Sequence, residues 1–270
     1  MTNNSTVTKQ LGSSVRVIGD RGSGKTGYMA ALVRWPNASE TSAVKSINPF
    51  NDEGKELITK AQNILEQGDS LSPTPLDTDV DQVKDYGITI VLKEQFNWEL
   101  NKLIQLNINC KDYAGEFFSD LLYRRGDILL EKYIEDCVLA DGLLLMLDGL
   151  GYRKDANYAQ GLGNLLQELD HYGQINQMRR RIALVVTKCE QPQLWVNRHN
   201  PKLILEARFP QTLTRLQQWQ NKGEKEIDFF CTSAFGMLGK DFPEPNMKIE
   251  ARDHGGIKQS CLKNARLWKP

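Results

Sequence analysis

The sequence predicts an α/β protein in which a mainly parallel sheet of six strands lies between two layers of helices. Apolar runs typical of strands alternate with helical segments, and two of these runs are continuous enough to be buried central strands. A chain of 270 residues with 40% hydrophobic content can bury the core of one such domain and carry a small appendage. In parallel sheets ligands bind at the carboxyl ends of the strands, so we expect a site there.

The expected elements follow one another in a regular order along the chain. The six strands are expected at 14–18 (SVRVI), 87–93 (GITIVLK), 103–110 (LIQLNINC), 140–149 (ADGLLLMLDG), 181–188 (RIALVVTK) and 226–234 (EIDFFCTSA). The apolar runs at 140–149 and 181–188 read as buried strands, whereas 103–110 alternates between apolar and polar residues. Helices are expected at 28–33, 53–66, 116–136, 156–172 and 203–221.

Changes in composition suggest three parts. Residues 1–13 form a polar tail, and residues 14–236 form the main domain. An enlarged, mostly polar insertion at 34–86 contains the proline-bearing loop SLSPTPLDTDVD. Residues 237–270 are expected to form an extension that packs on the domain and ends in a short helix at QSCLKNARLW.

Charge and cysteine usage narrow the class of protein. Lys plus Arg and Asp plus Glu both total 34, so we expect neither nucleic acid nor an anionic membrane as a partner. The five cysteines lack a CxxC pair and predict free thiols in a reducing compartment. The polar N-terminus has no apolar core of a signal peptide, which favours a cytoplasmic protein.

A glycine-rich loop, GDRGSGKT at 19–26, lies between the first strand and the first helix. It matches the phosphate-binding pattern GxxxxGK[ST] in full. Its glycines allow backbone N–H groups to turn onto phosphate oxygens, Lys25 is expected to reach the β and γ phosphates, and the Thr26 hydroxyl is expected to bind Mg²⁺. The residues expected to contact nucleotide here are Gly19, Asp20, Arg21, Gly22, Ser23, Gly24, Lys25, Thr26 and Gly27.

Three further motifs follow later strands. KDYAG places Asp112 to hold Mg²⁺ through water and Gly115 to meet the γ-phosphate. TKCE, which begins at Thr187, offers a Lys stem for a purine ring and a carboxylate on Glu190 for guanine N1 and N2. TSAFG offers backbone N–H groups near guanine O6, through Ser233 and Ala234. Lys188 and Glu190 could also simply begin a solvated helix.

These four motifs, in this order and at these strand ends, resemble the P-loop GTPases over about residues 14–236. The resemblance implies Mg²⁺-dependent binding and hydrolysis of GTP, with two switch segments. It implies that Thr74, or alternatively Thr78, is the switch threonine that contacts Mg²⁺ and the γ-phosphate. A narrower likeness, in GDRGSGKTGYMAAL, CKDYAGEFF and ADGLLLMLDG, is to the double-GTPase group of bacterial conflict systems.

The sequence departs from the GTPase pattern at three positions. Glu190 replaces the Asp of the guanine motif, Glu116 stands where Ras-like members carry a water-orienting Gln, and Arg21 replaces a P-loop Gly. Arg21, Lys25, Thr74, Gly115 and Glu116 are therefore the candidates for roles in hydrolysis.

Three functional readings stay open. The first is a slow GTPase that acts as a switch for an effector or activating protein, with nucleotide-dependent self-association as one form of activation. The second is an interaction module that holds GTP with little hydrolysis. The third, a P-loop ATPase or kinase, rests on the phosphate loop alone.

Overall fold

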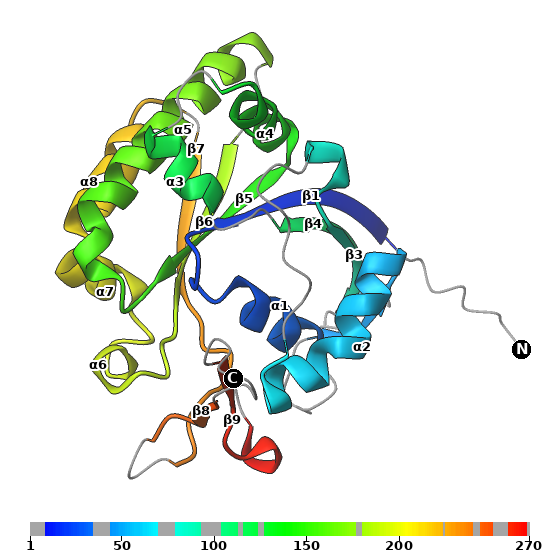
Figure 1. Ribbon diagram of the computed structural model, residues 1–270. Coiled ribbons are helices and arrows are strands. Elements are labelled where there is room, and N and C mark those ends of the chain that lie inside the picture. Colours follow the sequence, from blue (N-terminus) through cyan, green and yellow to red (C-terminus); the bar gives the residue numbers. More distant parts are fainter. Residues whose placement is uncertain are drawn as a thin grey trace, which may run out of the picture.

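The computed structural model describes residues 9–34, 44–69, 79–92, 104–112, 116–123, 127–176, 180–223, 225–239, 244–250 and 259–268. In these residues one sheet of seven strands has the order β2-β3-β4-β1-β5-β6-β7, with helices on both faces (Figure 1). The strands are β1 (Lys9–Gly19), β2 (Val44–Pro49), β3 (Asp85–Leu92), β4 (Ile104–Asp112), β5 (Gly142–Asp148), β6 (Arg180–Thr187) and β7 (Lys225–Cys231). This is the expected three-layer α/β sandwich of P-loop nucleotide-binding proteins.

Five adjacent strands, from β4 to β7 in the sheet order, are parallel. β1 pairs with β4 on one side and β5 on the other, and β6 and β7 continue the sheet in the same direction. Toward the opposite edge, β3 pairs antiparallel with β4, and the edge strand β2 pairs antiparallel with β3. The carboxyl ends of β1, β4, β5, β6 and β7 therefore meet at one edge of the sheet.

The expectation of six strands was wrong, because β2 adds a seventh within the insertion at 34–86. Its sequence, VKSINP, contains one buried residue, Ile47, so it carries almost no strand signal. It pairs with β3 at the edge of the sheet, where only one neighbour is needed. β1 also begins at Lys9, inside the segment taken as a polar tail, because backbone pairing of Lys9 with Ile104 requires no apolar side chain.

Two apolar clusters hold the layers together. On one face, α1 (Lys25–Arg34) and α2 (Asp52–Gln67) pack against residues such as Val17, Ile88 and Met146. On the other face the cluster is built by α3 (Glu116–Tyr123), α4 (Ile128–Leu139), α5 (Asp155–Asn176), α6 (Pro192–Trp195), α7 (Pro201–Arg208) and α8 (Pro210–Gln220). The sheet thus provides apolar side chains to both layers, as the buried strands predicted.

The helix expected at 116–136 is two helices. α3 ends at Tyr123, and α4 begins at Ile128 after a new N-cap. The Asp127 carboxylate accepts hydrogen bonds from the backbone N–H groups of Leu129 and Leu130, at 2.9 and 3.3 Å. This side-chain cap satisfies the first N–H groups of α4, so a separate helix begins here.

The C-terminal extension contains a hairpin instead of the expected closing helix. β8 (Met247–Glu250) pairs antiparallel with β9 (Gln259–Leu262), and only Ala265–Leu267 forms a helical turn. QSCLKNARLW therefore begins as a strand, because its buried residues Cys261 and Leu262 are adjacent and point to opposite sides of the hairpin. Leu262 and Trp268 join the α1–α2 apolar cluster.

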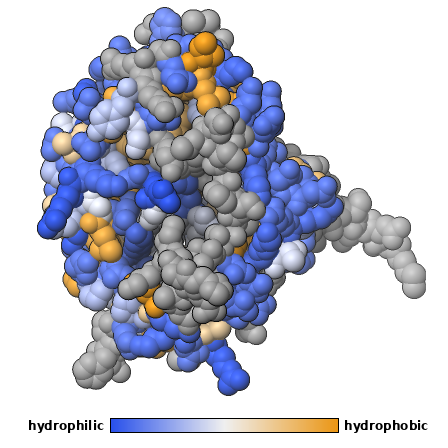
Figure 2. Space-filling view, viewed as in Figure 1, coloured by the Kyte–Doolittle hydropathy of each residue, from blue (hydrophilic) through white to orange (hydrophobic). Residues whose placement is uncertain are grey.

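The face shown in Figure 2 is mainly hydrophilic, with scattered hydrophobic residues. Among the described residues, no helix has the length and apolar character needed to span a membrane.

Candidate nucleotide-binding site

A cavity of about 550 Å³ lies where the carboxyl ends of β1, β6 and β7 meet. Residues 22–27 line it on one side, and the ends of β6 and β7 line it on the other. Three motifs far apart in sequence, GDRGSGKT, TKCE and TSAFG, therefore face one space. The cavity lining from these motifs includes Gly22, Ser23, Gly24, Lys25, Thr26, Gly27, Thr187, Lys188, Glu190 and Ala234.

The glycine-rich loop has the conformation that its glycines permit. Gly22 and Gly24 have φ values of 76° and 88°, which side chains with a Cβ rarely adopt. At Gly19 a Cβ would lie 2.6 Å from Ser23 Oγ and 2.7 Å from the Met146 carbonyl oxygen. The tight turn therefore requires glycine at these positions.

Lys25, in the first turn of α1, points its ammonium group back over this loop. Its Nζ donates to the carbonyl oxygens of Gly19 at 2.9 Å and Asp20 at 3.4 Å. These neutral acceptors are weaker partners than a phosphate oxygen would be. The ammonium group is therefore held at the cavity, where it can exchange these carbonyl oxygens for the oxygens of a bound anion.

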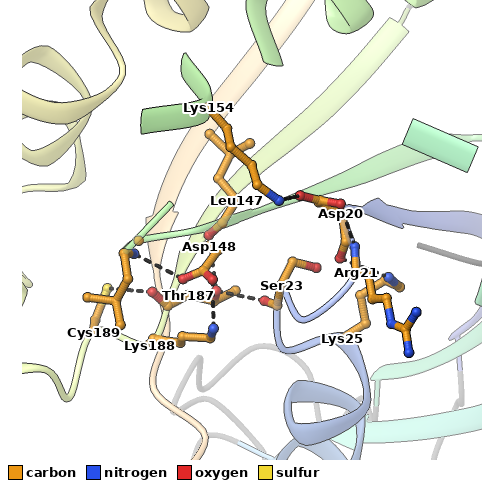
Figure 3. Close-up of polar contacts among 12 residues, drawn as sticks. Asp20, Arg21, Ser23, Lys25, Leu147, Asp148, Lys154, Thr187, Lys188 and Cys189 are labelled. Atoms are coloured by element: carbon orange, nitrogen blue, oxygen red, sulfur yellow. Dashed lines mark hydrogen bonds and ion pairs between the residues drawn. The ribbon is translucent and has the colours of Figure 1, made fainter. Parts of the chain in front are cut away.

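Asp20 joins the loop to the start of α5. Its carboxylate accepts from the backbone N–H of Arg21 at 2.7 Å and from the Tyr158 hydroxyl at 3.3 Å, and it forms an ion pair with Lys154 (Figure 3). Burial, with the negative charge of Asp20 nearby, raises the pKa of Tyr158, so this hydroxyl stays protonated and donates. The Arg21 side chain is exposed and points away from this cluster.

Thr187 connects the loop to the sheet. Its hydroxyl lies 2.7 Å from the Ser23 carbonyl oxygen and 3.0 Å from the Leu147 carbonyl oxygen. The side chain therefore braces the backbone of the glycine-rich loop against β5 and β6. Ser23 Oγ is buried and has no hydrogen-bond partner among the described residues.

Lys188 and Asp148 form an ion pair at the ends of β6 and β5. Lys188 Nζ lies 2.7 Å from Asp148 Oδ2, and the backbone N–H of Leu150 donates to Asp148 Oδ1 at 2.9 Å. Lys188 is the only described non-glycine residue with positive φ, at 59°. The sequence interpretation missed Asp148, although a carboxylate that directly follows a buried strand is a signal for this edge of the sheet.

Glu190 carries a buried carboxylate at the cavity. The residue is 1% exposed, and its Oε2 has no hydrogen-bond partner among the described residues. Burial raises the pKa of Glu190, while a hydrogen bond with the Ser233 side chain lowers it in part. A buried acceptor that lacks a donor is unfavourable unless a ligand supplies one.

The loop after β7 lies against the first turn of α1. A Cβ on Gly27 would lie 3.4 Å from the Cβ of Ala234, so the two segments are in contact. Within the loop, the Gly236 N–H donates to Ser233 Oγ at 2.7 Å, and the Trp268 indole donates to the Ala234 carbonyl at 2.9 Å.

The residues expected at the Mg²⁺ are only partly described. Thr26 lines the cavity, and the backbone of Asp112 pairs with Val17 of β1, just before the glycine-rich loop. Thr74, Thr78 and Gly115 lie outside the described residues, and so do the side chains of Asp112 and Glu116.

No group of three or more His, Cys, Asp and Glu side chains that could hold a metal occurs in the described part of the chain. The Thr26 hydroxyl in the cavity is an oxygen donor of the kind that Mg²⁺ prefers, so this described residue fits the ion.

Comparison with known proteins adds structural neighbours only. No family model and no curated protein matches the chain. Similar solved structures include the signal recognition particle receptor SRb–GTP/SRX complex from Chaetomium thermophilum, at 13% identity over 83% of this chain and 91% of that chain, with a TM-score of 0.43. SRb–GDP from the same organism has 11% identity over 87% of this chain and 93% of that chain, with a TM-score of 0.39.

The small COPII coat GTPase Sar1 from Encephalitozoon cuniculi, in complex with GDP, is a third similar structure. It has 12% identity over 82% of this chain and 69% of that chain, with a TM-score of 0.33.

Proposed function

We propose that the protein binds GTP and GDP with Mg²⁺, hydrolyses GTP slowly, and uses the bound nucleotide as a switch toward a partner protein. The observation that carries this proposal is the buried Glu190 carboxylate, whose Oε2 lacks a donor in the same cavity that the glycine-rich loop lines. A phosphate-binding loop alone fits any nucleotide. A desolvated carboxylate beside it selects for a base that offers N–H donors.

Guanine matches this acceptor better than adenine does. Its N1–H and N2 amino group lie side by side and can donate together to one carboxylate, whereas the corresponding edge of adenine has no such pair. A site built around a buried acceptor rejects a ligand that leaves it unpaired, because desolvation is then not compensated. Although Glu190 is one methylene longer than the Asp of the guanine motif, its carboxylate lies within hydrogen-bond reach of the Ser233 side chain in the loop after β7.

The chain's own residues would bind and orient the triphosphate. Lys25 would exchange the Gly19 carbonyl for β- and γ-phosphate oxygens, and the N–H groups of residues 22–26 would surround the β-phosphate. Thr26 and Asp112 would hold Mg²⁺, which neutralises charge that develops on the phosphates during transfer. Thr74 and Gly115 are proposed to contact the γ-phosphate side.

Slow turnover follows from the residues proposed to face the γ-phosphate. Glu116 stands where a Gln would orient the attacking water, and a carboxylate near the γ-phosphate repels it unless it is paired. Arg21 would restrict the approach of an arginine from a partner or would itself lie over the phosphates. We therefore propose acceleration by an activating protein or by self-association. The likeness to conflict-system GTPases supports an effector protein as the partner.

The experiment is a comparison of GTP, GDP and ATP binding in the presence of Mg²⁺, followed by measurement of phosphate release. We expect at least tenfold tighter binding of guanine nucleotides, and intrinsic turnover on the order of 10⁻⁴ to 10⁻² per second. Equal competition by ATP would favour the ATPase alternative. Guanine selectivity without phosphate release would favour an interaction module, and a monomer that turns over faster than about once per second would contradict a slow switch.

Glu116→Ala separates the catalytic claim from the binding claim. If the Glu116 carboxylate affects the attacking water, the variant changes the rate of phosphate release while the dissociation constant for GDP stays the same. An unchanged rate shows that Glu116 has no catalytic role.

A further inference from the structure

A chain of hydrogen bonds encloses the loop after β7 at residues 233–236, here called the base loop. Its partners come from residues 244–250 and 259–268, here called the C-terminal segment. The backbone N–H of Asn246 donates to the Gly236 carbonyl at 2.9 Å. Asn246 and Asn264 then exchange two bonds: Asn246 Nδ2 donates to the Asn264 carbonyl at 2.9 Å, and the Asn264 N–H donates to Asn246 Oδ1 at 2.7 Å.

The same segment returns to the base loop through Trp268. After the helical turn at Ala265–Leu267, the Trp268 indole Nε1 donates to the Ala234 carbonyl at 2.9 Å. Asn246 is completely buried and Trp268 is 6% exposed, so water cannot readily substitute for these bonds. The base loop is thus held at both Ala234 and Gly236 by one segment.

The Trp268 bond determines the direction of a backbone donor. The Ala234 carbonyl and the Phe235 N–H belong to one planar trans peptide and point in opposite directions. Fixing the carbonyl toward Trp268 therefore fixes where the Phe235 N–H points. Ala234 and Phe235 both line the cavity, as Glu190 does.

The C-terminal segment also forms part of the cavity itself. Met247, Ile249 and Ser260, from the β8–β9 hairpin, line the same cavity as the glycine-rich loop and Glu190. Ile249 is 61% exposed, although it is apolar. Because Lys188 and the hairpin line one cavity, the hairpin is placed to contact a nucleotide base bound there.

We propose that the C-terminal segment sets base specificity, with Trp268 and Asn246 as positioning residues that hold the base loop in the conformation that receives guanine. This inference rests on the proposed guanine-nucleotide site. It assigns a role in ligand selection to residues outside the four motifs, and it predicts that base selectivity can be lost while phosphate binding is retained.

The test is Trp268→Phe, which keeps an aromatic ring in the apolar cluster and removes the indole donor. The matched control is Trp219→Phe on α8, because Trp219 is also buried and its indole donates to Asp170 at 2.7 Å, on the opposite face of the sheet. The dissociation constants of GDP and ADP are measured by titration calorimetry with Mg²⁺. We expect Trp268→Phe to reduce the preference for GDP over ADP by about three- to tenfold, and Trp219→Phe to leave it unchanged.

The outcomes distinguish the two proposals. If the unmodified protein does not prefer GDP over ADP, the proposed guanine site is wrong. If it does, and Trp268→Phe has the same preference, the positioning role is wrong while the guanine site stands. If Trp219→Phe reduces the preference for GDP over ADP by the same factor, the positioning role is also wrong, because the effect would then reflect a general destabilisation of the fold.

A second measurement is made on the unmodified protein. The indole N–H signals of the five tryptophans can be followed by NMR during titration with GDP. We expect the Trp268 signal to shift on saturation and the Trp219 signal to stay in place. An unmoved Trp268 signal would overturn the proposal even if Trp268→Phe fails to fold.

Discussion

At the scale of single residues, the buried Glu190 carboxylate lowers the stability of the ligand-free protein and is proposed to bind the base of the nucleotide. Its carboxylate is buried, and burial raises its pKa above the usual value of 4.5. The stability that this group contributes is fully present below pH 4.5 and is lost as the pH rises through the higher folded-state pKa. Ionisation of this buried carboxyl group is therefore unfavourable in the ligand-free protein, and guanine N–H donors would compensate that cost.

Glu190→Gln should separate these two effects. Because Gln does not ionise, the variant should be more stable than the unmodified protein at pH 7 in the absence of nucleotide, with a Tm higher by about 2–4 °C per kcal/mol recovered. The gain should shrink as the pH falls toward 4.5. The preference for GDP over ADP should decrease, because the amide offers one acceptor and places donors against N1–H and N2.

The measurements are thermal unfolding from pH 4.5 to 8 and nucleotide titration at pH 7. Glu206→Gln, an exposed position on α7, serves as the control and should change neither quantity. A lower Tm for Glu190→Gln at neutral pH would show that the carboxylate is compensated within the protein.

Lys25→Ala should abolish measurable nucleotide binding. In the ligand-free protein the ammonium group donates to the backbone carbonyls of Gly19 and Asp20, and charge-assisted bonds to phosphate are stronger. Removing bonds to a charged group costs about 1.5–3 kcal/mol for each, so the dissociation constant for GDP should rise by about 100-fold or more. Lys132→Ala on α4 is the control, and affinity within about threefold of the unmodified protein would refute a phosphate-binding role for Lys25.

At the scale of elements, α4 is fastened to the sheet by a nearly buried cluster of charges. Asp136 on α4 accepts from Arg16 of β1 at 2.5 and 2.9 Å and lies 3.3 Å from Lys111 Nζ of β4. The three side chains are between 9% and 14% exposed. Lys111 immediately precedes Asp112, so this cluster also fixes the end of the strand that carries the proposed Mg²⁺ ligand.

Asp136→Ala should therefore destabilise the fold strongly, since it leaves two cations in a poorly solvated place. Breaking a buried pair by removing one partner costs about 3–5 kcal/mol. Urea unfolding measures the difference. Asp79→Ala removes a half-exposed partner of Lys132 on the same helix and should have a much smaller effect, because water screens that pair. Equal effects of the two variants would show that burial does not control the contribution of these ion pairs.

The elements that sequence patterns predicted are those whose signal is local. Continuous apolar runs revealed β5 and β6, and the glycine spacing revealed the loop before α1, because each depends on neighbouring residues alone. Since parallel strands end at one edge, TKCE and TSAFG could also be expected to lie near that loop. β2 was not predicted, because only Ile47 of its residues is buried and its sequence therefore lacks an apolar pattern.

Asp148 and Trp268 were missed for a different reason. Their environment depends on partners distant in sequence: Asp148 pairs with Lys188, 40 residues away, and Trp268 bonds Ala234, 34 residues away. Neither contact leaves a spacing pattern in one chain. Thr187 lines the cavity, as expected of a nucleotide-binding residue, and its hydroxyl also bonds the loop backbone, which only the packing of three segments reveals.

At the scale of the whole molecule, the proposed site divides into a braced part and a part that depends on the third phosphate. In the braced part, Thr187 joins the glycine-rich loop to the sheet, and the Asp20–Lys154 pair joins the same loop to the turn before α5. Trp268 joins the base loop to the C-terminal segment. The parts proposed to contact the γ-phosphate are the loop around Thr74 and the segment 112–118. Their order should depend on Mg²⁺ and γ-phosphate contacts.

Hydrogen exchange of the complete chain tests this division. With a non-hydrolysable GTP analogue and Mg²⁺, backbone amides in 70–80 and 112–125 should exchange more slowly than with GDP, because the γ-phosphate offers contacts that GDP lacks. Amides of β6 and β7 should exchange equally in the two states, since the base and the first two phosphates are common to both nucleotides. Lys25→Ala, which should not bind either nucleotide, is the control and should show no difference in any segment. Equal exchange throughout 70–80 and 112–125 in the unmodified protein, at saturating concentrations of both ligands, would exclude a switch driven by the γ-phosphate and leave a nucleotide-binding module of constant shape.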